Sequence, residues 1–253
     1  MKPFLSVIIP CYNEKENLNR GVLREVNDYM KKQKYSWEVI VSDDGSTDGS
    51  IEIVESQIKG WNNFRQLKNP HGGKPSTLMY GIKNAKGKYV LFTDMDQSTP
   101  INQLNKLLPH ASKDYGAIIG SRGMNRKSFP WYRRLGAVVF MTFRKALLLA
   151  EIDDTQCGFK LFEAKMVSKA FPQIEHFRNK EEVRGWKVTS FDVELLHIIK
   201  KMGFKIKEVR VVWNDDDEST GKGNARSKYI KESKEMFTQI LRVKINDLKG
   251  MYN

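Results

Sequence analysis

The 253-residue chain is long enough for one large α/β domain or two small ones, and its 40% hydrophobic content supports a packed core. Its 43 basic and 30 acidic residues give a net charge of +13, which favours an anionic partner such as nucleic acid, an acidic membrane surface or a phosphorylated substrate. No RNA- or DNA-binding motif accompanies this charge, so we do not expect nucleic acid. The two cysteines, Cys11 and Cys157, form no disulfide framework and indicate a reducing compartment.

The sequence shows neither a signal-peptide pattern nor a membrane-spanning pattern. The N-terminal residues enter a strand at once, and no uncharged apolar run reaches the roughly 18 to 20 residues that a spanning helix needs. The best candidate, residues 135–150, contains Arg144 and Lys145, each of which costs about 2.5–3.5 kcal/mol at a bilayer centre. We therefore expect a soluble protein or one bound to a membrane surface.

The first half of the chain alternates strand and helix patterns. Strands are predicted at 4–9, 37–42, 64–67, 89–93 and 116–120, and helices at 14–32, 49–59, between 74 and 85, and at 100–108. Because strands separated by helices of this length form right-handed β-α-β units, the pattern predicts an α/β fold with a mostly parallel sheet flanked by helices. Ligands bind at the carboxyl ends of such strands, where the polar residues 10–14, 43–46 and 94–98 fall.

The second half of the chain has a different texture. It is predicted to contain a basic loop after Ser121, an apolar helix ending near residue 150, a strand at 157–162, a helix at 191–202, a strand at 205–213 and an acidic, then glycine-rich loop at 214–225. From Ser227 the pattern is that of one amphipathic helix. We therefore divide the chain into a main domain at 1–226 and a C-terminal amphipathic extension at 227–253.

Two aspartates one residue apart, Asp94 and Asp96, directly follow the strand at 89–93. Successive side chains of an extended chain point to opposite sides, so the pair suits two different contacts. One carboxylate can hold a divalent cation, because Mg²⁺ and Mn²⁺ take oxygen ligands, and the other can reach a sugar or ribose hydroxyl. A solvated turn is the plain alternative, since aspartate is common in turns.

Four motifs resemble, in order and spacing, those of inverting family 2 glycosyltransferases: residues 10–14, 43–46, 94–96 and 154–160. The resemblance covers about residues 4–230 and is closest to the polyprenyl- and dolichyl-phosphate sugar transferases. Residues 155–160, Thr-Gln-Cys-Gly-Phe-Lys, are most similar to the dolichyl-phosphate β-glucosyltransferase branch. The resemblance implies a Rossmann-like GT-A fold, a Mg²⁺ or Mn²⁺ cofactor, and glucose transfer from UDP-glucose to a polyprenyl phosphate. Mannosyl transfer from GDP-mannose is an alternative.

The same resemblance implies a donor site for the nucleotide sugar. Pro10 and Tyr12 would wall the base, Glu14 and Asp44 would reach the nucleoside, and Asp96 would bind the cation. The full donor-binding set is Pro10, Tyr12, Glu14, Asp43, Asp44, Lys74, Asp94 and Asp96, with Asp94 and Asp96 also the metal ligands. Alternatively, Pro10 only ends a strand, and Lys74 is a solvated side chain.

The acceptor decides which catalytic groups are needed. A phosphate monoester has a second pKa near 6 and needs positioning by cations, not proton removal. The candidates that the resemblance implies are Arg122, Arg133, Arg134, Arg226, Ser227 and Lys228. A carbohydrate hydroxyl would instead need a general base, for which Asp192 is the candidate; Asp192 is equally a helix cap or a positioning residue. The predicted catalytic residues are therefore Asp96, Arg122 and Asp192.

Aromatic and basic residues that precede the apolar helix suit a membrane interface. Trp131 and Tyr132 stand beside arginines, and each cation near an anionic leaflet contributes roughly 1 kcal/mol. We expect peripheral docking at the cytosolic face of the cell membrane or of the ER, directly or through an anchoring partner. Alternatively, these helices are ordinary core and a homo-oligomer surface. A pseudo-enzyme that senses nucleotide sugars is a further alternative, against which the complete Asp-Met-Asp argues.

Overall fold

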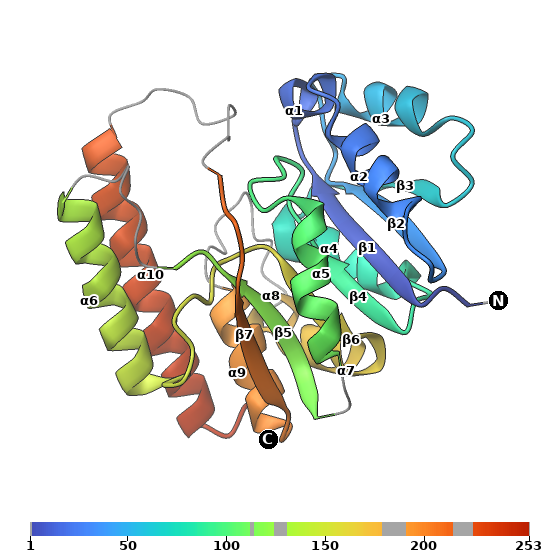
Figure 1. The fold of residues 1–253 in the computed structure, drawn as a ribbon. Coiled ribbons are helices and arrows are strands. Elements are labelled where there is room, and N and C mark those ends of the chain that lie inside the picture. Colours follow the sequence, from blue (N-terminus) through green and yellow to red (C-terminus); the bar gives the residue numbers. More distant parts are fainter. Residues whose placement is uncertain (1, 112–113, 124–130, 179–190, 215–224, 253) are drawn as a thin grey trace.

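The computed structural model describes residues 2–111, 114–123, 131–178, 191–214 and 225–252, with backbone alone at 131–135, 137 and 225–234. Its strands form one sheet in the order β3-β2-β1-β4-β6-β5-β7 (Figure 1). They are β1 (Leu5–Cys11), β2 (Trp37–Asp43), β3 (Phe64–Lys68), β4 (Tyr89–Phe92), β5 (Tyr115–Ser121), β6 (Lys160–Glu163) and β7 (Lys205–Arg210). All neighbouring pairs are parallel except those made by β6, which runs antiparallel to both β4 and β5. The predicted α/β fold with a mostly parallel sheet is confirmed.

Helices cover both faces of this sheet. They are α1 (Lys15–Asn19), α2 (Val22–Met30), α3 (Ser50–Ile58), α4 (Gly73–Asn84), α5 (Leu104–Leu107), α6 (Trp131–Leu147), α7 (Ala164–Ala170), α8 (Glu175–Arg178), α9 (Phe191–Lys201) and α10 (Ala225–Leu248). The single helix predicted at 14–32 is two helices, because Gly21 adopts φ 91° and interrupts the helical backbone between α1 and α2. Only glycine takes this left-handed conformation without a steric cost.

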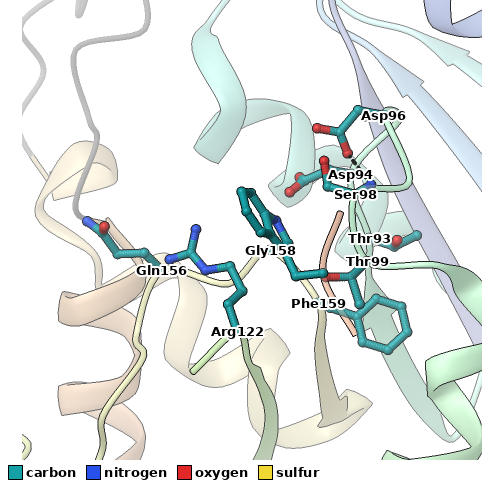
Figure 2. A pocket seen from close by; sticks show the side chains of 10 residues that line it. Thr93, Asp94, Asp96, Ser98, Thr99, Arg122, Gln156, Gly158 and Phe159 are labelled. Atoms are coloured by element: carbon teal, nitrogen blue, oxygen red, sulfur yellow. Dashed lines mark hydrogen bonds between the residues drawn. The ribbon is translucent and has the colours of Figure 1, made fainter. Parts of the chain in front are cut away.

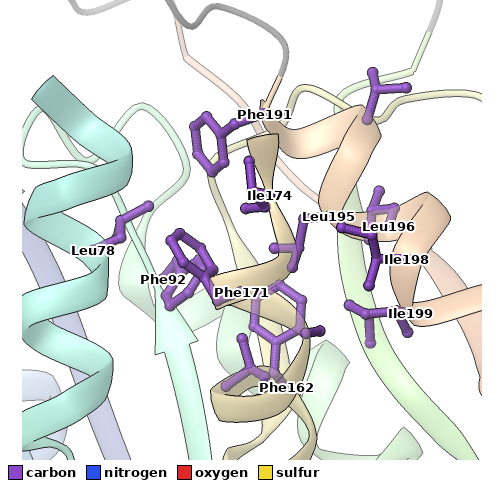
Figure 3. Packing of buried hydrophobic residues seen from close by; sticks show 14 of the residues in the cluster. Leu78, Phe92, Phe162, Phe171, Ile174, Phe191, Leu195, Leu196, Ile198 and Ile199 are labelled. Carbon is purple, nitrogen blue, oxygen red and sulfur yellow. The ribbon is translucent and has the colours of Figure 1, made fainter. Parts of the chain in front are cut away.

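Alternating side chains of the strands feed two separate cores. Ile8, Val90 and Phe92 point into one core, which α4, α7, α9 and α10 cover, whereas Val7 and Leu91 point into the other, under α1, α2 and α5. In the first core, Phe92 packs on Phe162 with a ring-centroid distance of 4.8 Å, and isoleucines and leucines of α9 close the cluster (Figure 3). Both faces of the central strands are therefore buried, which explains their nearly continuous apolar runs.

The C-terminal helix α10 packs against α6, beside it at the left of Figure 1. Phe237 of α10 contacts Phe143 of α6 at a centroid distance of 5.1 Å, and Ile240 and Val243 are fully buried in the first core. The segment predicted as an extension thus contributes to the core of the main domain, and the division at residue 226 stays a prediction. None of the described helices combines the length and the apolar character that crossing a membrane requires.

Arg144, predicted to interrupt an apolar helix, has a specific structural place. Its side chain is 1% exposed, and its guanidinium donates hydrogen bonds to the backbone oxygens of Leu149, Ile152 and Asp153. The buried guanidinium is therefore hydrogen-bonded to three carbonyls of the segment that follows α6.

The strand order of the sheet reverses between β1 and β4. The chain moves from β1 outward through β2 to β3, and then crosses to the other side of β1 to form β4. Pairing between β1 and β4 ends at Ile8 and Phe92, while β1 continues to Cys11 alongside β2. Pro10 fits here because its missing N–H faces the side where β4 has already ended. Such a reversal in strand order at the carboxyl ends is where open α/β sheets bind ligands.

Candidate active site

A pocket opens at the carboxyl end of β4, and it brings together three of the predicted site residues. Asp94, Asp96 and Arg122 line it, together with Ser98, Gln156, Gly158 and Trp213 among others. In Figure 2 the Arg122 guanidinium and Gln156 lie across the pocket from Asp94 and Asp96. The pocket therefore has an acidic wall from the turn after β4 and a cationic wall from the end of β5.

Asp94 is held by a lysine on one side and by a glycine on the other. The Lys74 ammonium, in the first turn of α4, donates a hydrogen bond to Oδ1 of Asp94 at 2.6 Å. Burial alone would raise the pKa of Asp94, but the nearby cations Lys74, Lys160 and Arg122 together outweigh burial and lower it. A Cβ at Gly158 would stand 1.9 Å from Oδ2 of Asp94, so only glycine fits there. Lys74 is thus tied to the site and is not a solvated side chain.

Asp96 sits on a tight turn that leaves its carboxylate at the pocket wall. The backbone N–H of Ser98 donates to Oδ1 of Asp96 at 2.8 Å, and Arg20 Nη2 donates to the Asp96 backbone oxygen at 2.5 Å. Gln97 between them adopts φ 52°, which closes the turn. The dipeptide spacing therefore does aim the two carboxylates at different partners.

The donor set fits a hard divalent cation that a substrate helps to coordinate. Among the described residues no three His, Cys, Asp or Glu side chains converge as a metal cage. Mg²⁺ commonly takes one or two carboxylates and completes its shell with phosphate oxygens and water. Asp94 and Asp96 both line the pocket, and Asp94 is paired there with Lys74.

A bidentate ion pair fixes Arg122 at the opposite wall. Nε and Nη2 of Arg122 each donate to the carboxylate of Asp154 at 2.8 Å, and the Arg122 backbone N–H donates to the same group at 3.0 Å. Glu208 of β7 accepts the backbone N–H of Asp154 at 2.8 Å. Two parallel bonds to a planar guanidinium leave it little freedom, so Arg122 is preorganised to meet an anion.

Trp213 completes this wall from the end of β7. The ring of Trp213 lies 5.8 Å from Cζ of Arg122, within the range of a cation–π contact. Its chain neighbours are both anchored: the Val212 N–H donates to the Gln103 side chain at 3.0 Å, and the Asn214 N–H donates to the Ser98 backbone oxygen at 2.7 Å. The indole is therefore held between the turn after β4 and the end of β5.

A second group of predicted donor residues lies at the carboxyl ends of β1 and β2. The Tyr12 ring stacks on His71, with centroids 4.6 Å apart and an interplanar angle of 28°. Nδ1 of His71 lies 3.0 Å from both the backbone oxygen and Oδ2 of Asp44. Asp44 also accepts the backbone N–H groups of Gly72 at 3.0 Å and Gly73 at 2.9 Å. This carboxylate fastens the loop that leads into Lys74.

The remaining donor candidates are engaged in local hydrogen bonds. Asp43 is fully buried and accepts the backbone N–H groups of Gly45 and Ser46 at 2.8 and 2.9 Å, which shapes the turn after β2. Glu14 accepts a hydrogen bond from the Asn17 side chain at 2.6 Å. Burial raises the pKa of the Cys11 thiol, with the Asp43 charge adding to the effect, as expected for a structural cysteine. Contacts of these residues with a nucleoside stay predictions.

Asp192 does not line the pocket directly. It stands in the first turn of α9, and its Oδ1 accepts a hydrogen bond at 2.7 Å from Nζ of Lys160, which is 1% exposed. Apart from Arg122, the predicted acceptor residues are placed by backbone alone: Arg133 and Arg134 in the first turn of α6, and Arg226, Ser227 and Lys228 at the beginning of α10. Their side chains lie outside the described residues.

Among the site residues that sequence reasoning did not predict are Asp154, Lys160, His71 and Trp213. Asp154 and Lys160 are the first and last residues of the motif at 154–160. Their charge, close to a predicted strand, was the available signal that they belong to the site. His71 directly precedes the two glycines at the beginning of α4, and Trp213 ends a predicted strand. None of these positions has a spacing that identifies its partner.

Residues 6–171 match the family model of Glycosyl transferase family 2. A dolichyl-phosphate beta-glucosyltransferase from Dictyostelium discoideum is 32% identical over 98% of this chain, which spans 76% of that protein. The enzyme of that name from Saccharomyces cerevisiae is 29% identical over 85% of this chain, which spans 68% of it. A third relative, the dolichyl-phosphate beta-glucosyltransferase ALG5D of Trichomonas vaginalis, is 29% identical over 84% of this chain, which spans 66% of that protein.

Solved structures share the fold at low identity. A mannosyltransferase from Pyrobaculum calidifontis, in complex with GDP-Man and Mn²⁺, aligns over 99% of this chain and 75% of its own with a TM-score of 0.56 and 18% identity. Glucosyl-3-phosphoglycerate synthase from Mycobacterium tuberculosis, in complex with UDP, aligns over 96% of this chain and 80% of its own with a TM-score of 0.59 and 15% identity. The predicted family and the GT-A fold are confirmed: this chain belongs to glycosyl transferase family 2.

Proposed function

We propose that this protein transfers glucose from UDP-glucose to a polyprenyl phosphate, with inversion at the anomeric carbon. One observation carries the proposal: a single pocket sets the acidic pair Asp94 and Asp96 opposite Arg122, which Asp154 fixes in place. The acidic wall suits a cation-bound diphosphate, and the cationic wall suits the phosphate of the acceptor. The similarity to dolichyl-phosphate beta-glucosyltransferases supports this donor and this acceptor.

The reaction needs no proton removal from the acceptor. An oxygen of the anionic phosphate monoester attacks the anomeric carbon and forms a new C–O bond. The bond between that carbon and the diphosphate oxygen breaks, its electron pair leaves with UDP, and the configuration at the carbon inverts. The protein contributes by holding the two anionic substrates in line, since correct placement of two reactants supplies a large part of a rate enhancement.

The site residues then take the following roles. Tyr12 stacks on the base, Asp94 meets the ribose or sugar, and Asp96 would hold the divalent cation, Mg²⁺ or Mn²⁺. That cation supplies charge that stabilises the UDP leaving group. Lys74 places a further positive charge beside Asp94, on the donor side of the pocket. Arg122 orients the acceptor phosphate, with Arg133, Arg134, Arg226, Ser227 and Lys228 as further contacts of the acceptor.

The acceptor lipid implies work at a membrane surface, and we place the protein peripherally at a cytosolic membrane face. Paired helices α6 and α10 expose apolar side chains there, with Val138, Val139, Leu241 and Ile245 each 44–51% exposed. Exposed apolar side chains on a pair of helices suit an interfacial contact. A membrane-anchoring partner or a second copy of the chain would use the same helices.

The test is a reconstituted transfer assay. The full chain is incubated with UDP-glucose, Mg²⁺ or Mn²⁺ and a short-chain polyprenyl phosphate, and the lipid extract is analysed by mass spectrometry. We expect UDP release and a glucosyl lipid, both abolished by Asp96→Asn and reduced with GDP-mannose as donor. Transfer to a sugar hydroxyl together with no transfer to any prenyl phosphate would refute the proposal.

A further inference from the structure

A buried ion pair lies beneath the pocket and joins β6 to α9. Lys160 begins β6, and Asp192 stands in the first turn of α9. Nζ of Lys160 is 2.7 Å from Oδ1 of Asp192; the lysine side chain is 1% exposed and that of Asp192 14%. A buried ammonium is costly unless it is paired and hydrogen-bonded, so a lysine at this place demands a specific reason.

The lysine also reaches the turn that supports Asp94. Nζ of Lys160 donates a second hydrogen bond to the backbone oxygen of Cys157. The next residue, Gly158, packs so closely on Asp94 that no side chain fits between them. Lys160 therefore fixes the peptide against which the Asp94 carboxylate rests, while Lys74 holds that carboxylate from its other side.

Charge explains why Asp192 accompanies this lysine. Nζ of Lys160 donates to Oδ1 of Asp192, whose side chain is only 14% exposed. Without Lys160, Asp192 would be a nearly buried anion that has lost the cation it contacts, which is costly.

We infer that Lys160 is a positioning residue for the donor-side carboxylate Asp94, and that Asp192 is its counter-ion and not the proton acceptor of the reaction. The inference rests on the proposed function, since a phosphate acceptor needs no base. Asp192, the candidate general base for a carbohydrate acceptor, is thereby assigned the role of counter-ion to Lys160. Donor binding and turnover, and not acceptor binding, then depend on the Lys160–Asp192 pair.

Four variants of the full chain test this inference: Lys160→Met, Lys160→Arg, Asp192→Asn and the double variant Lys160→Met/Asp192→Asn. Kinetics are measured with both substrates varied. Lys160→Met should lower kcat about 30-fold or more and raise the KM for UDP-glucose, because a displacement near 1 Å costs about 10²-fold. The KM for the prenyl phosphate should not change, and Lys160→Arg should retain part of the activity.

The decisive comparison is between Asp192→Asn and the double variant. Asparagine keeps an oxygen for Lys160, so Asp192→Asn should retain activity within about tenfold of the wild type, whereas loss of a general base costs about 10²–10⁴-fold. The double variant should be at least about threefold more active than Lys160→Met alone, because it removes the nearly buried anion that Lys160→Met leaves without its cation. Loss of activity near 10³-fold in Asp192→Asn would overturn the inference.

A matched control separates positioning from general destabilisation. Lys200→Met on the same helix as Asp192 removes a surface ion pair to Glu151 at 2.7 Å, whose side chains are 46% and 48% exposed, and should leave both KM values unchanged. Thermal unfolding measurements show whether Lys160→Met is folded. If it is not, the activities of Lys160→Arg and Asp192→Asn still test the inference. Failure of the wild type to use any prenyl phosphate refutes the proposed function instead, so the two failures are distinguishable.

Discussion

Substitution of Asp154 by asparagine tests the role of Arg122 without touching Arg122 itself. Asparagine conserves shape but replaces one carboxylate oxygen by an NH₂ group, which faces the guanidinium and cannot accept a bond. The variant thus breaks one of two parallel bonds, each 2.8 Å long, and removes the negative charge beside Arg122. The guanidinium then loses its fixed orientation at the pocket wall.

The size of the effect follows from burial. Losing one partner of a buried ion pair costs about 3–5 kcal/mol, and solvent access reduces this value. The side chains of Arg122 and Asp154 are 16% and 11% exposed, and asparagine retains one acceptor oxygen, so we expect a loss of about 2 kcal/mol. If the whole loss is felt at the acceptor phosphate, kcat/KM for the prenyl phosphate falls about 30-fold, since each 1.4 kcal/mol is a factor of ten.

The assay measures initial rates of glucosyl-lipid formation with each substrate varied in turn. The expected result is a raised KM for the prenyl phosphate and an unchanged KM for UDP-glucose. Asp153→Asn is the matched control, because Asp153 is the chain neighbour, its side chain is 55% exposed and it pairs with Lys145 at the surface. Equal KM values for the prenyl phosphate in Asp154→Asn and the wild type would show that Arg122 does not bind the acceptor.

Three further predictions concern other parts of the molecule. Gly158→Ala should abolish transfer and weaken UDP binding measured by calorimetry, because its Cβ would displace Asp94, and an unchanged affinity would contradict the close contact. Tyr12→Leu should raise the KM for UDP-glucose about tenfold, because stacking of one base contributes about 1–3 kcal/mol. The KM for the prenyl phosphate should not change. An unchanged KM for UDP-glucose would show that Tyr12 does not contact the base. Burial raises the pKa of Glu194, although Arg242 opposes this effect, so the folded protein binds its proton more tightly than the unfolded chain and stability falls as pH rises above the ordinary glutamate range. Thermal unfolding of Glu194→Gln should therefore shift in favour of the variant between about pH 5 and about pH 8; parallel curves would indicate an unperturbed Glu194.

The alternation of patterns along the chain was enough to predict the sheet and the edge at which its chemistry gathers. Runs such as residues 5–9 and 89–92 are apolar throughout because helices cover both faces of their strands, so they are recognisable without any partner. The acidic residues that follow them had to meet at one edge, because parallel strands end together. The Asp94–Met95–Asp96 step and the neighbouring turns were predicted on this basis.

The ion-pair partners of the site residues could not be predicted from the sequence. Lys160 and Asp192 are 32 residues apart, as are Arg122 and Asp154, and no periodicity relates them. Both pairs depend on β6, which inserts antiparallel between β4 and β5 and so brings residues 154–160 under the pocket. A strand of four residues has too short a hydrophobic pattern to predict whether it pairs parallel or antiparallel with its neighbours.

Local chemistry therefore determined which groups this chain offers, and tertiary structure determined what each one does. Strand runs and turn residues follow from side-chain size, burial and backbone freedom, which act over a few positions and can be read along the chain. Whether Asp192 is a base or a counter-ion depends on a lysine delivered by a different strand. Electrostatic roles are set by distance and desolvation in space, and only the folded chain fixes those.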